Sequence, residues 1–170
     1  NDKIIMSSSS TYNDSSSNTI WGGSGTDTIS YEAYNNTNRV FVNLASNIAT
    51  IYKSSSSEID SLHQIENIIG GAGDDTLWGN ELINLIDGGA GDDILRGNEG
   101  NDTLNGNIEN DVADYSYLNN SINMNLSLSE YQVINDGFGS KDTLLGIETI
   151  WASQTNDILI GSNDKDVIYG

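Results

Sequence analysis

The sequence of 170 residues contains no cysteine, no proline and a single histidine, His63. Without cysteine the chain can form neither disulfides nor a zinc–thiolate site. His63 has no HExxH or Ser-His-Asp pattern near it, so we interpret it as a solvated side chain rather than a metal ligand or a general base. These absences exclude disulfide-stapled domains and cysteine-based zinc domains.

Positive charge is scarce, since six Lys and Arg residues stand against 25 Asp and Glu residues and the formal net charge is −19. Such a surface repels nucleic acid and anionic membranes and attracts metal cations. No apolar run approaches the roughly 18 residues of a membrane span, and no signal peptide opens the chain. The sequence starts inside a repeat motif and stops where another repeat would begin, so we expect a piece of a longer protein.

Five nonapeptides follow one another between Gly70 and Asp114: GGAGDDTLW, GNELINLID, GGAGDDILR, GNEGNDTLN and GNIENDVAD. Each has glycine first, an acid or its amide sixth, and an apolar residue eighth. The sixth positions are Asp75, Asn84, Asp93, Asp102 and Asp111. An apolar residue that recurs every nine residues between glycines predicts a strand of about three residues between sharp turns.

The glycines permit positive φ and let the backbone approach a ligand closely. A loop of exposed carbonyls closed by a carboxylate suits a hard cation such as Ca²⁺. Two nonapeptides make one coil, so nonapeptides i and i+2 should stack at roughly 4.7–4.9 Å. Asp75, Asp93 and Asp111 then form one column, and Asn84 and Asp102 form the opposite one. Carboxylates at this spacing repel one another unless a cation lies between them.

The repeat resembles the calcium-binding nonapeptide G-G-x-G-x-D-x-U-x of RTX (repeats-in-toxin) proteins. The resemblance implies an all-β fold, a right-handed parallel β-roll or β-solenoid with calcium-binding turns and longer β inserts. It implies that the calcium ligands are the sixth-position carboxylates and main-chain oxygens around Gly71, Gly73, Gly89 and Gly91. It further implies a bacterial protein exported by type I secretion and found outside the cell or on its surface.

The rest of the chain consists of two copies of one β module. We predict a degenerate module at 1–69, the nonapeptide roll at 70–114 and the second copy at 115–170, all in one continuous solenoid. Ile65-Glu66-Asn67-Ile68 matches Ile147-Glu148-Thr149-Ile150 at an offset of 82 residues. The serine-rich segment between residues 7 and 17 is expected to be a surface loop.

Further ligand candidates extend the two columns. Asp60 would precede Asp75 in the first column. Glu66 would precede Asn84 in the second, although Asn84 brings no charge and its loop lacks glycine. Asp27 closes a full GGSGTD loop, but the sequence does not show on which turn it stacks.

The second copy offers weaker candidates. Asp142 would pair with Asp157, and Glu148 with Asp166. Because the loops there contain few glycines, plain turns without metal are an equal alternative.

We therefore expect a non-enzymatic calcium-binding module of a larger secreted or surface protein. One apolar side chain in nine residues buries too little surface to offset the cost of ordering the backbone, so ion binding must contribute to folding. The expected partners are calcium ions, with neither nucleic acid nor membrane insertion, and a glycan or cell surface reached through the parent protein.

The alternative is a polysaccharide-acting or adhesive module. The doublets Asp74-Asp75 and Asp92-Asp93 lie on turns, where adjacent acids point apart, unlike the converging acids of a glycosidase. The three tryptophans at ninth positions form either a stacking platform for a sugar or, as we favour, aromatic caps on a thin solenoid: Trp21, Trp78 and Trp151.

Overall fold

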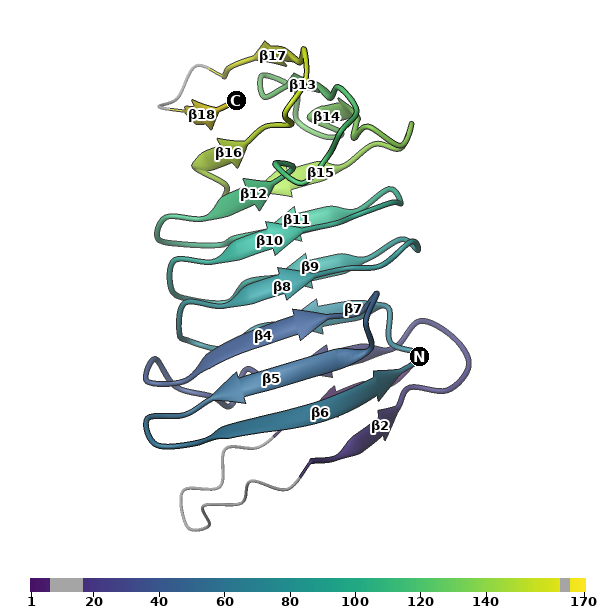
Figure 1. Ribbon diagram of the computed structural model, residues 1–170, viewed down its shortest axis with the longest axis vertical. Helices are drawn as coiled ribbons and strands as arrows, with labels where there is room; N and C mark the ends of the chain where they lie inside the picture. The colour runs from purple at the N-terminus through teal and green to yellow at the C-terminus, as the bar shows by residue number, and fades with distance from the viewer. Residues whose placement is uncertain (7–16, 163–165) are drawn as a thin grey trace.

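The chain winds into a stack of coils, and each coil contributes one short strand to each of two facing sheets (Figure 1). The computed structural model describes residues 1–6, 17–162 and 166–170. The serine-rich loop expected between residues 7 and 17 therefore lies, apart from Ser17, outside the described residues. Within the described ranges there is no helix, and so none that could cross a membrane.

The described residues form three hydrogen-bonded sheets, of which the three-stranded one continues the six-stranded one through a bridge between Val133 and Asp142. The six-stranded sheet has the order β1 (Lys3–Ile5), β3 (Thr28–Ser30), β7 (Asn67–Ile69), β9 (Leu85–Asp87), β11 (Thr103–Asn105), β15 (Thr143–Leu145). The nine-stranded sheet has the order β18 (Val167–Tyr169), β16 (Thr149–Trp151), β12 (Val112–Asp114), β10 (Ile94–Arg96), β8 (Thr76–Trp78), β4 (Arg39–Asn43), β5 (Ile48–Tyr52), β6 (Ser57–His63), β2 (Thr19–Trp21). The three-stranded sheet has the order β14 (Val133–Asn135), β13 (Asn123–Asn125), β17 (Ile158–Ile160).

The eighth-position side chains stack into the core between the sheets. Leu77 pairs with Leu95 across parallel strands, Leu95 pairs with Ala113, and Ile86 pairs with Leu104 on the opposite sheet. All of these side chains are fully buried, while their strand neighbours face outward because alternate side chains point to opposite faces. Nonapeptides two apart thus stack as predicted, and the fold is the parallel β-roll expected from the sequence.

Each flanking module inserts antiparallel strands into this parallel stack. In the first copy, β5 pairs antiparallel with both β4 and β6, which separates β6 from the nonapeptide strand β8. In the second copy, β14 pairs antiparallel with β13, and an antiparallel bridge joins Val133 to Asp142. The same order of neighbouring strands therefore occurs twice. The first copy has β2-β6-β5-β4-β8, and the second copy has β11-β15-β14-β13-β17, in which each strand number is higher by nine.

The duplication read from the sequence is also present in the hydrogen bonds. The amide of Val40 donates to Asp75 Oδ1 at 2.7 Å, and the amide of Ile122 donates to Asp157 Oδ1 at 2.9 Å. Both members of the second pair lie 82 residues after their counterparts. Successive strands of the regular roll alternate between the two facing sheets, so a shift by nine strands, an odd number, exchanges the sheets. Accordingly, β2 belongs to the nine-stranded sheet and β11 to the six-stranded one.

Candidate cation-binding turns

Sixth-position side chains form two hydrogen-bonded ladders along the edges of the roll. In the first, the Asp75 amide donates to Asp93 Oδ1 at 2.7 Å, and the Asp93 amide donates to Asp111 Oδ1 at 2.9 Å. In the second, the Asn84 amide donates to Asp102 Oδ1 at 2.8 Å. One oxygen of each later sixth-position carboxylate therefore accepts a hydrogen bond from the preceding turn of its column, which fixes the spacing of successive turns.

The ladders continue beyond the central repeats. The amide of Asp27 donates to Glu66 Oε2 at 2.8 Å, and strand β3 lies between β1 and β7, so Asp27 stacks between Asp2 and Glu66. Glu66, Asn84 and Asp102 share the second column, as predicted. Glu148 and Asp166 precede the neighbouring strands β16 and β18, and Glu148 Oε2 accepts the Asp111 amide at 2.9 Å.

Two of the predicted stacking pairs, Asp60 with Asp75 and Asp142 with Asp157, are wrong. Asp60 does not stack on Asp75, because β4 and β5 lie between their strands; its Oδ1 instead accepts the Asn18 amide at 2.9 Å. Asp142 does not pair with Asp157. Its Oδ1 accepts the Asp102 amide at 3.0 Å, since the inserted strands of the second copy place it directly after the nonapeptide run. In both cases the inserted antiparallel strands changed which turn stacks on which.

The turns are of two kinds, which differ at the second residue. In the turns of Asp75 and Asn84, the second residue donates its amide to the sixth side chain, from Gly71 at 2.7 Å and from Asn80 at 2.8 Å. In four other turns the second residue has positive φ, and the sixth-position Oδ2 has no hydrogen-bond partner among the described residues. The second residues are Gly23, Gly89, Asn98 and Asn107, and the acids are Asp27, Asp93, Asp102 and Asp111.

These unpartnered oxygens lie in an environment that disfavours charge. All four carboxylates are at most 1% exposed. Burial raises the pKa of Asp93 and of Asp102 to about 8. It raises the pKa of Asp75 and Asp111 to about 6 and that of Asp142 to about 7. A buried carboxylate with a free oxygen is stabilised by a proton or by a cation.

Main-chain oxygens lie close to the same turns. A Cβ on Gly89 would lie 2.2 Å from the carbonyl oxygen of Gly71, and one on Gly91 would lie 2.9 Å from that of Gly73. Within the described residues, no three His, Asp or Glu side chains lie close enough together to hold a metal by themselves. A cation between successive turns would therefore need carbonyl oxygens as ligands in addition to the carboxylates, which is the kind of ligand set that hard divalent ions prefer.

Of the buried acids with an unpartnered oxygen among the described residues, one was missed from the sequence. Asp136 is 1% exposed; its Oδ1 accepts the amides of Phe138 at 2.9 Å and Ser140 at 2.8 Å, and its Oδ2 has no partner among the described residues. It lies in the hairpin between β14 and β15. The run Asn135-Asp136-Gly137 was the available signal, because these residue types favour tight turns.

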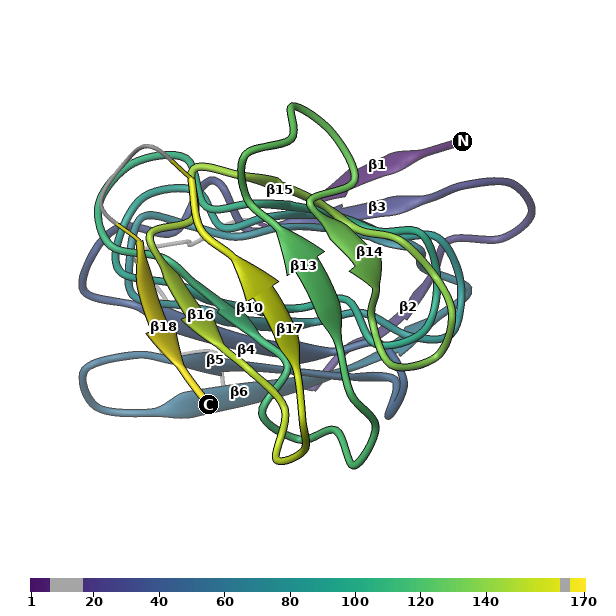
Figure 2. The ribbon, with the colours of Figure 1, turned by 90° about the horizontal axis from the view of Figure 1, so that it is seen from above.

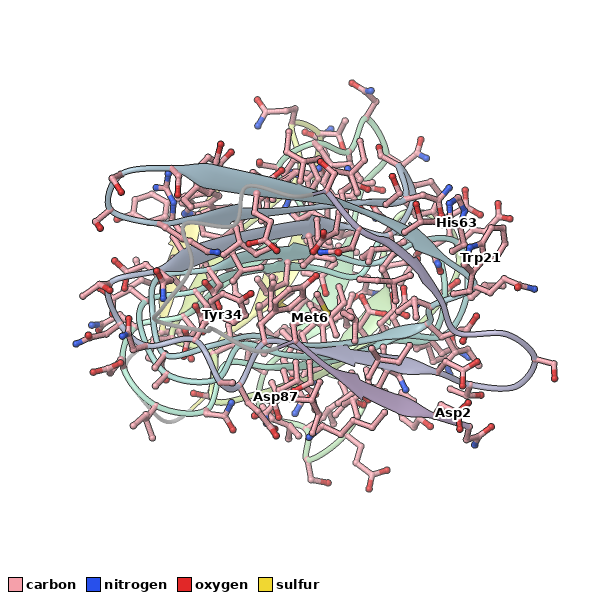
Figure 3. All side chains as sticks on the ribbon, turned by 90° about the horizontal axis from the view of Figure 1, so that it is seen from below. Asp2, Met6, Trp21, Tyr34, His63 and Asp87 are labelled. Carbon is pink, nitrogen blue, oxygen red and sulfur yellow. The ribbon has the colours of Figure 1, made fainter. Side chains whose placement is uncertain are left out.

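The outward-facing residues are engaged with one another. The Arg96 guanidinium lies 4.0 Å from the ring centres of both Trp78 and Tyr117 and forms an ion pair with Asp114. Trp21 stacks on His63 with the ring centres 4.2 Å apart (Figure 3). Of the acidic doublets, Asp74 and Asp92 are exposed whereas Asp75 and Asp93 are buried, so the two acids of each doublet point apart.

The match to a known family completes the description of these turns. The model of the RTX calcium-binding nonapeptide repeat matches four segments, residues 14–37, 65–81, 78–113 and 137–170, which together cover more than half of the chain. The chain belongs to the RTX calcium-binding nonapeptide repeat family. No curated protein matches the sequence. All five RTX nonapeptides of the central run lie almost wholly within the matched segments, and the RTX match also reaches into both flanking modules.

The raised pKa values predict how calcium-free RTX turns respond to pH. The folded-state pKa of Asp93 and Asp102, about 8, lies above the ordinary value of about 3.9 expected in the unfolded chain. Between these values the folded state binds more protons, so its stability is greatest at the acidic end and falls as pH rises towards 8. Calcium-free protein should therefore gain circular-dichroism strand signal as pH is lowered from 8 to 5.

Saturating calcium provides the control for this pH series. Because calcium binds the deprotonated carboxylates, its affinity should rise with pH, and the strand signal of the loaded protein should be independent of pH over the same range. A calcium-free strand signal that falls on acidification would contradict the role assigned to these acids.

Proposed function

We propose that this chain is a non-catalytic, calcium-dependent structural module of a larger bacterial protein that acts outside the cell or on its surface. The observation that carries the proposal is the set of four turns in which a buried Asp oxygen has no hydrogen-bond partner among the described residues. Membership of a calcium-binding repeat family supports calcium as the cation. The module would remain loosely ordered where calcium is scarce and would form the roll where calcium is plentiful.

The residues present fit a calcium ion. Between the turns of Asp93 and Asp111, the two carboxylates, each with an unpartnered oxygen among the described residues, and main-chain carbonyl oxygens of the two turns would hold it. Calcium would supply the positive charge that the ladder lacks. The role of the chain is to hold the carboxylates in register, through the 2.7 and 2.9 Å bonds from Asp75 and Asp93, and to exclude water from the free oxygens.

Binding and folding are coupled in this scheme. The unfolded chain does not hold the carboxylates together, so the free energy of ion binding adds to the free energy of folding. Calcium modules outside the cell typically have dissociation constants of about 10⁻⁴–10⁻³ M, which matches calcium levels there rather than in cytosol. Secretion in a loose state followed by folding on exit is consistent with the type I route proposed for this protein.

The aromatic residues give little support to a polysaccharide-binding role. One face of Trp78 is covered by Arg96, and Trp78 forms a T-shaped pair with Phe41, with the ring centres 5.0 Å apart. Trp21 stacks on His63. A sugar ring would have to displace these contacts, so we place the adhesive or catalytic function of the parent protein elsewhere.

The proposal is tested by circular dichroism of the dialysed chain at pH 8 while calcium is added. We expect the strand signal to rise cooperatively with a midpoint of about 0.1–1 mM calcium. Magnesium is the matched control, because it demands a tighter octahedral set of ligands and should give little signal at the same concentration. Full strand signal in the presence of chelator would contradict the proposal.

A further inference from the structure

We propose that Asp136, in the hairpin between β14 and β15, is a calcium ligand that the second β module adds beside the turn of Asp102. The inference rests on the calcium-dependent role proposed above and extends it to a site that is not built from two nonapeptides. In the view from above, β14 lies beside β13 across the upper end of the stack (Figure 2). The hairpin that follows β14 leads back to β15, the strand stacked on the last nonapeptide of the second column.

The hairpin stacks directly on the turn of Asp102. Strand β15, which follows the hairpin, pairs in parallel with β11, which follows that turn. The Asp102 amide donates to Asp142 Oδ1 at 3.0 Å, and the Lys141 amide donates to Asn101 Oδ1 at 2.9 Å. These bonds place the hairpin one coil beyond Asp102, where the next turn of the column lies.

This pair of turns differs from the central pair in its free oxygens. Asp93 and Asp111 each have a buried Oδ2 without a partner among the described residues, and so does Asp102. Asp142, the next acid after Asp102, has both oxygens engaged: Oδ1 accepts the Asp102 amide, and Oδ2 accepts the Tyr115 hydroxyl at 2.8 Å. A cation beside Asp102 would therefore find one free carboxylate oxygen fewer in its column than a cation between Asp93 and Asp111.

Asp136 supplies an oxygen of the missing kind. Its side chain is 1% exposed; Oδ1 accepts the amides of Phe138 and Ser140, and Oδ2 has no partner among the described residues. Burial raises the pKa of Asp102 to about 8 and that of Asp142 to about 7, and the nearby negative charge of Asp136 adds to both shifts. Two buried oxygens, one on Asp102 and one on Asp136, are thus free in the same part of the roll.

No positive side chain offsets these charges. Among the described residues, no ion pair involves Asp102, Asp136 or Asp142, and Lys141, the basic residue of the hairpin, is exposed. A buried carboxylate oxygen without a partner is strongly disfavoured and calls for a proton or a cation. A proton satisfies one carboxylate, whereas a calcium ion takes six to eight oxygens and can bind both together with main-chain carbonyls.

The other copy of the module supports a specific role for this acid. Ser54 lies 82 residues before Asp136 and is exposed. The turn of the first copy stacks on the one that contains Asn18, whose side chain is neutral, whereas the hairpin of Asp136 stacks on Asp102. Of the two copies, the one whose insert carries the acid is the one stacked on an acidic sixth residue, as expected of two ligands that share a cation.

Calorimetric titration of Asp136→Asn with calcium at pH 8 tests the assignment. Asn keeps an oxygen for the amides of Phe138 and Ser140 and removes the charge. We expect one calcium site to weaken about tenfold or more while the others are unchanged, since affinity depends on the charge of the ligand set. Glu130→Gln is the matched control, because it removes one charge from an exposed residue in the β13–β14 loop of the same module and should leave every site unchanged.

Amide hydrogen exchange locates the weakened site. In the unsubstituted chain, calcium should slow exchange of the Phe138 and Ser140 amides about tenfold or more, because these amides donate to Asp136. In Asp136→Asn this local effect should be lost, whereas calcium should still protect the amides of Asp75 and Asp93. A purely structural Asp136 would not change the number of ions bound.

Three results would overturn the assignment. They are unchanged calcium sites in Asp136→Asn, the same loss in Glu130→Gln, and a stability loss in Asp136→Asn that is equal with and without calcium. An unsubstituted chain that binds no calcium at all would instead contradict the calcium-dependent function on which the assignment rests. The two failures are therefore distinguishable.

Discussion

Replacing Asp93 by Asn is expected to order the calcium-free chain and, at the same time, to weaken calcium binding. The Asp93 carboxylate is fully buried, and its Oδ2 has no partner among the described residues. Asn retains the oxygen that accepts the Asp75 amide and removes the buried charge. Asn84 shows that the position tolerates an amide: its Nδ2 donates to the Glu66 carbonyl at 2.6 Å.

The two effects of Asp93→Asn are measured separately. In calcium-free buffer at pH 8, the free energy of unfolding should rise by about 1–3 kcal/mol, the usual cost of an unsatisfied buried polar group. Calorimetry should show calcium affinity lowered about tenfold or more, since affinity depends on the charge of the ligand set. Asp92→Asn is the matched control, because it removes the same charge from an exposed neighbour.

Unchanged calcium affinity in Asp93→Asn would remove this carboxylate from the ligand set. Equal effects from Asp92→Asn would mean that net charge, rather than the buried oxygen, controls binding. For a cation ligand, Asp93→Asn should raise the free energy of unfolding without calcium and lower the affinity for calcium. A purely structural side chain would instead lose stability both with and without calcium.

Gly88→Ala is expected to destabilise the central roll by about 3 kcal/mol, the upper end of the usual cost of overpacking. A Cβ at this position would lie 2.2 Å from Asp93 Oδ2 and 2.9 Å from its Cγ. The carboxylate cannot move away without breaking its 2.7 Å bond to the Asp75 amide. Urea unfolding in saturating calcium measures the loss, and Gly170→Ala, where the nearest atom is 3.7 Å away, is the control.

A double-variant cycle tests the cause of the Gly88 effect. Asp93→Ala removes the two atoms nearest the new Cβ, so Gly88→Ala should cost much less in that background. If the stability losses of the two variants add, the cost of Gly88→Ala comes from the backbone around residue 88 and not from contact with the Asp93 carboxylate. The same design applies to Gly97 and Asp102, where the corresponding distance is also 2.2 Å.

The sequence predicts the stacking of the central turns because its period is strict. Two nonapeptides make one coil, so Asp75, Asp93 and Asp111 had to share a column, and the ladder of hydrogen bonds joins them. The prediction from spacing fails at Asp60 and Asp142. The inserted strands add residues there, so the number of residues between two acids no longer gives the number of coils between them. The alternating residues of the inserts indicate strands, but they do not show that these strands lie antiparallel between two turns.

The distinction between the two kinds of turn could not be read from the sequence. Gly71 and Gly89 occupy the same position in nearly identical nonapeptides, GGAGDDTLW and GGAGDDILR. Only Gly89 has positive φ, and only Asp93 is left with a free oxygen. The difference arises from the neighbouring coil, since the turn of Asp75 stacks on the insert strand that begins near Val40, whereas that of Asp93 stacks on another nonapeptide.

Amide hydrogen exchange, resolved by residue, tests the central claim most directly. The amides of Asp75, Asn84 and Asp93 donate to the sixth-position oxygens that are expected to order around calcium. We predict that calcium slows their exchange by roughly a thousandfold relative to chelator, because the turns open when the carboxylates lose the cation. Equal protection of these three amides with and without calcium would contradict the account.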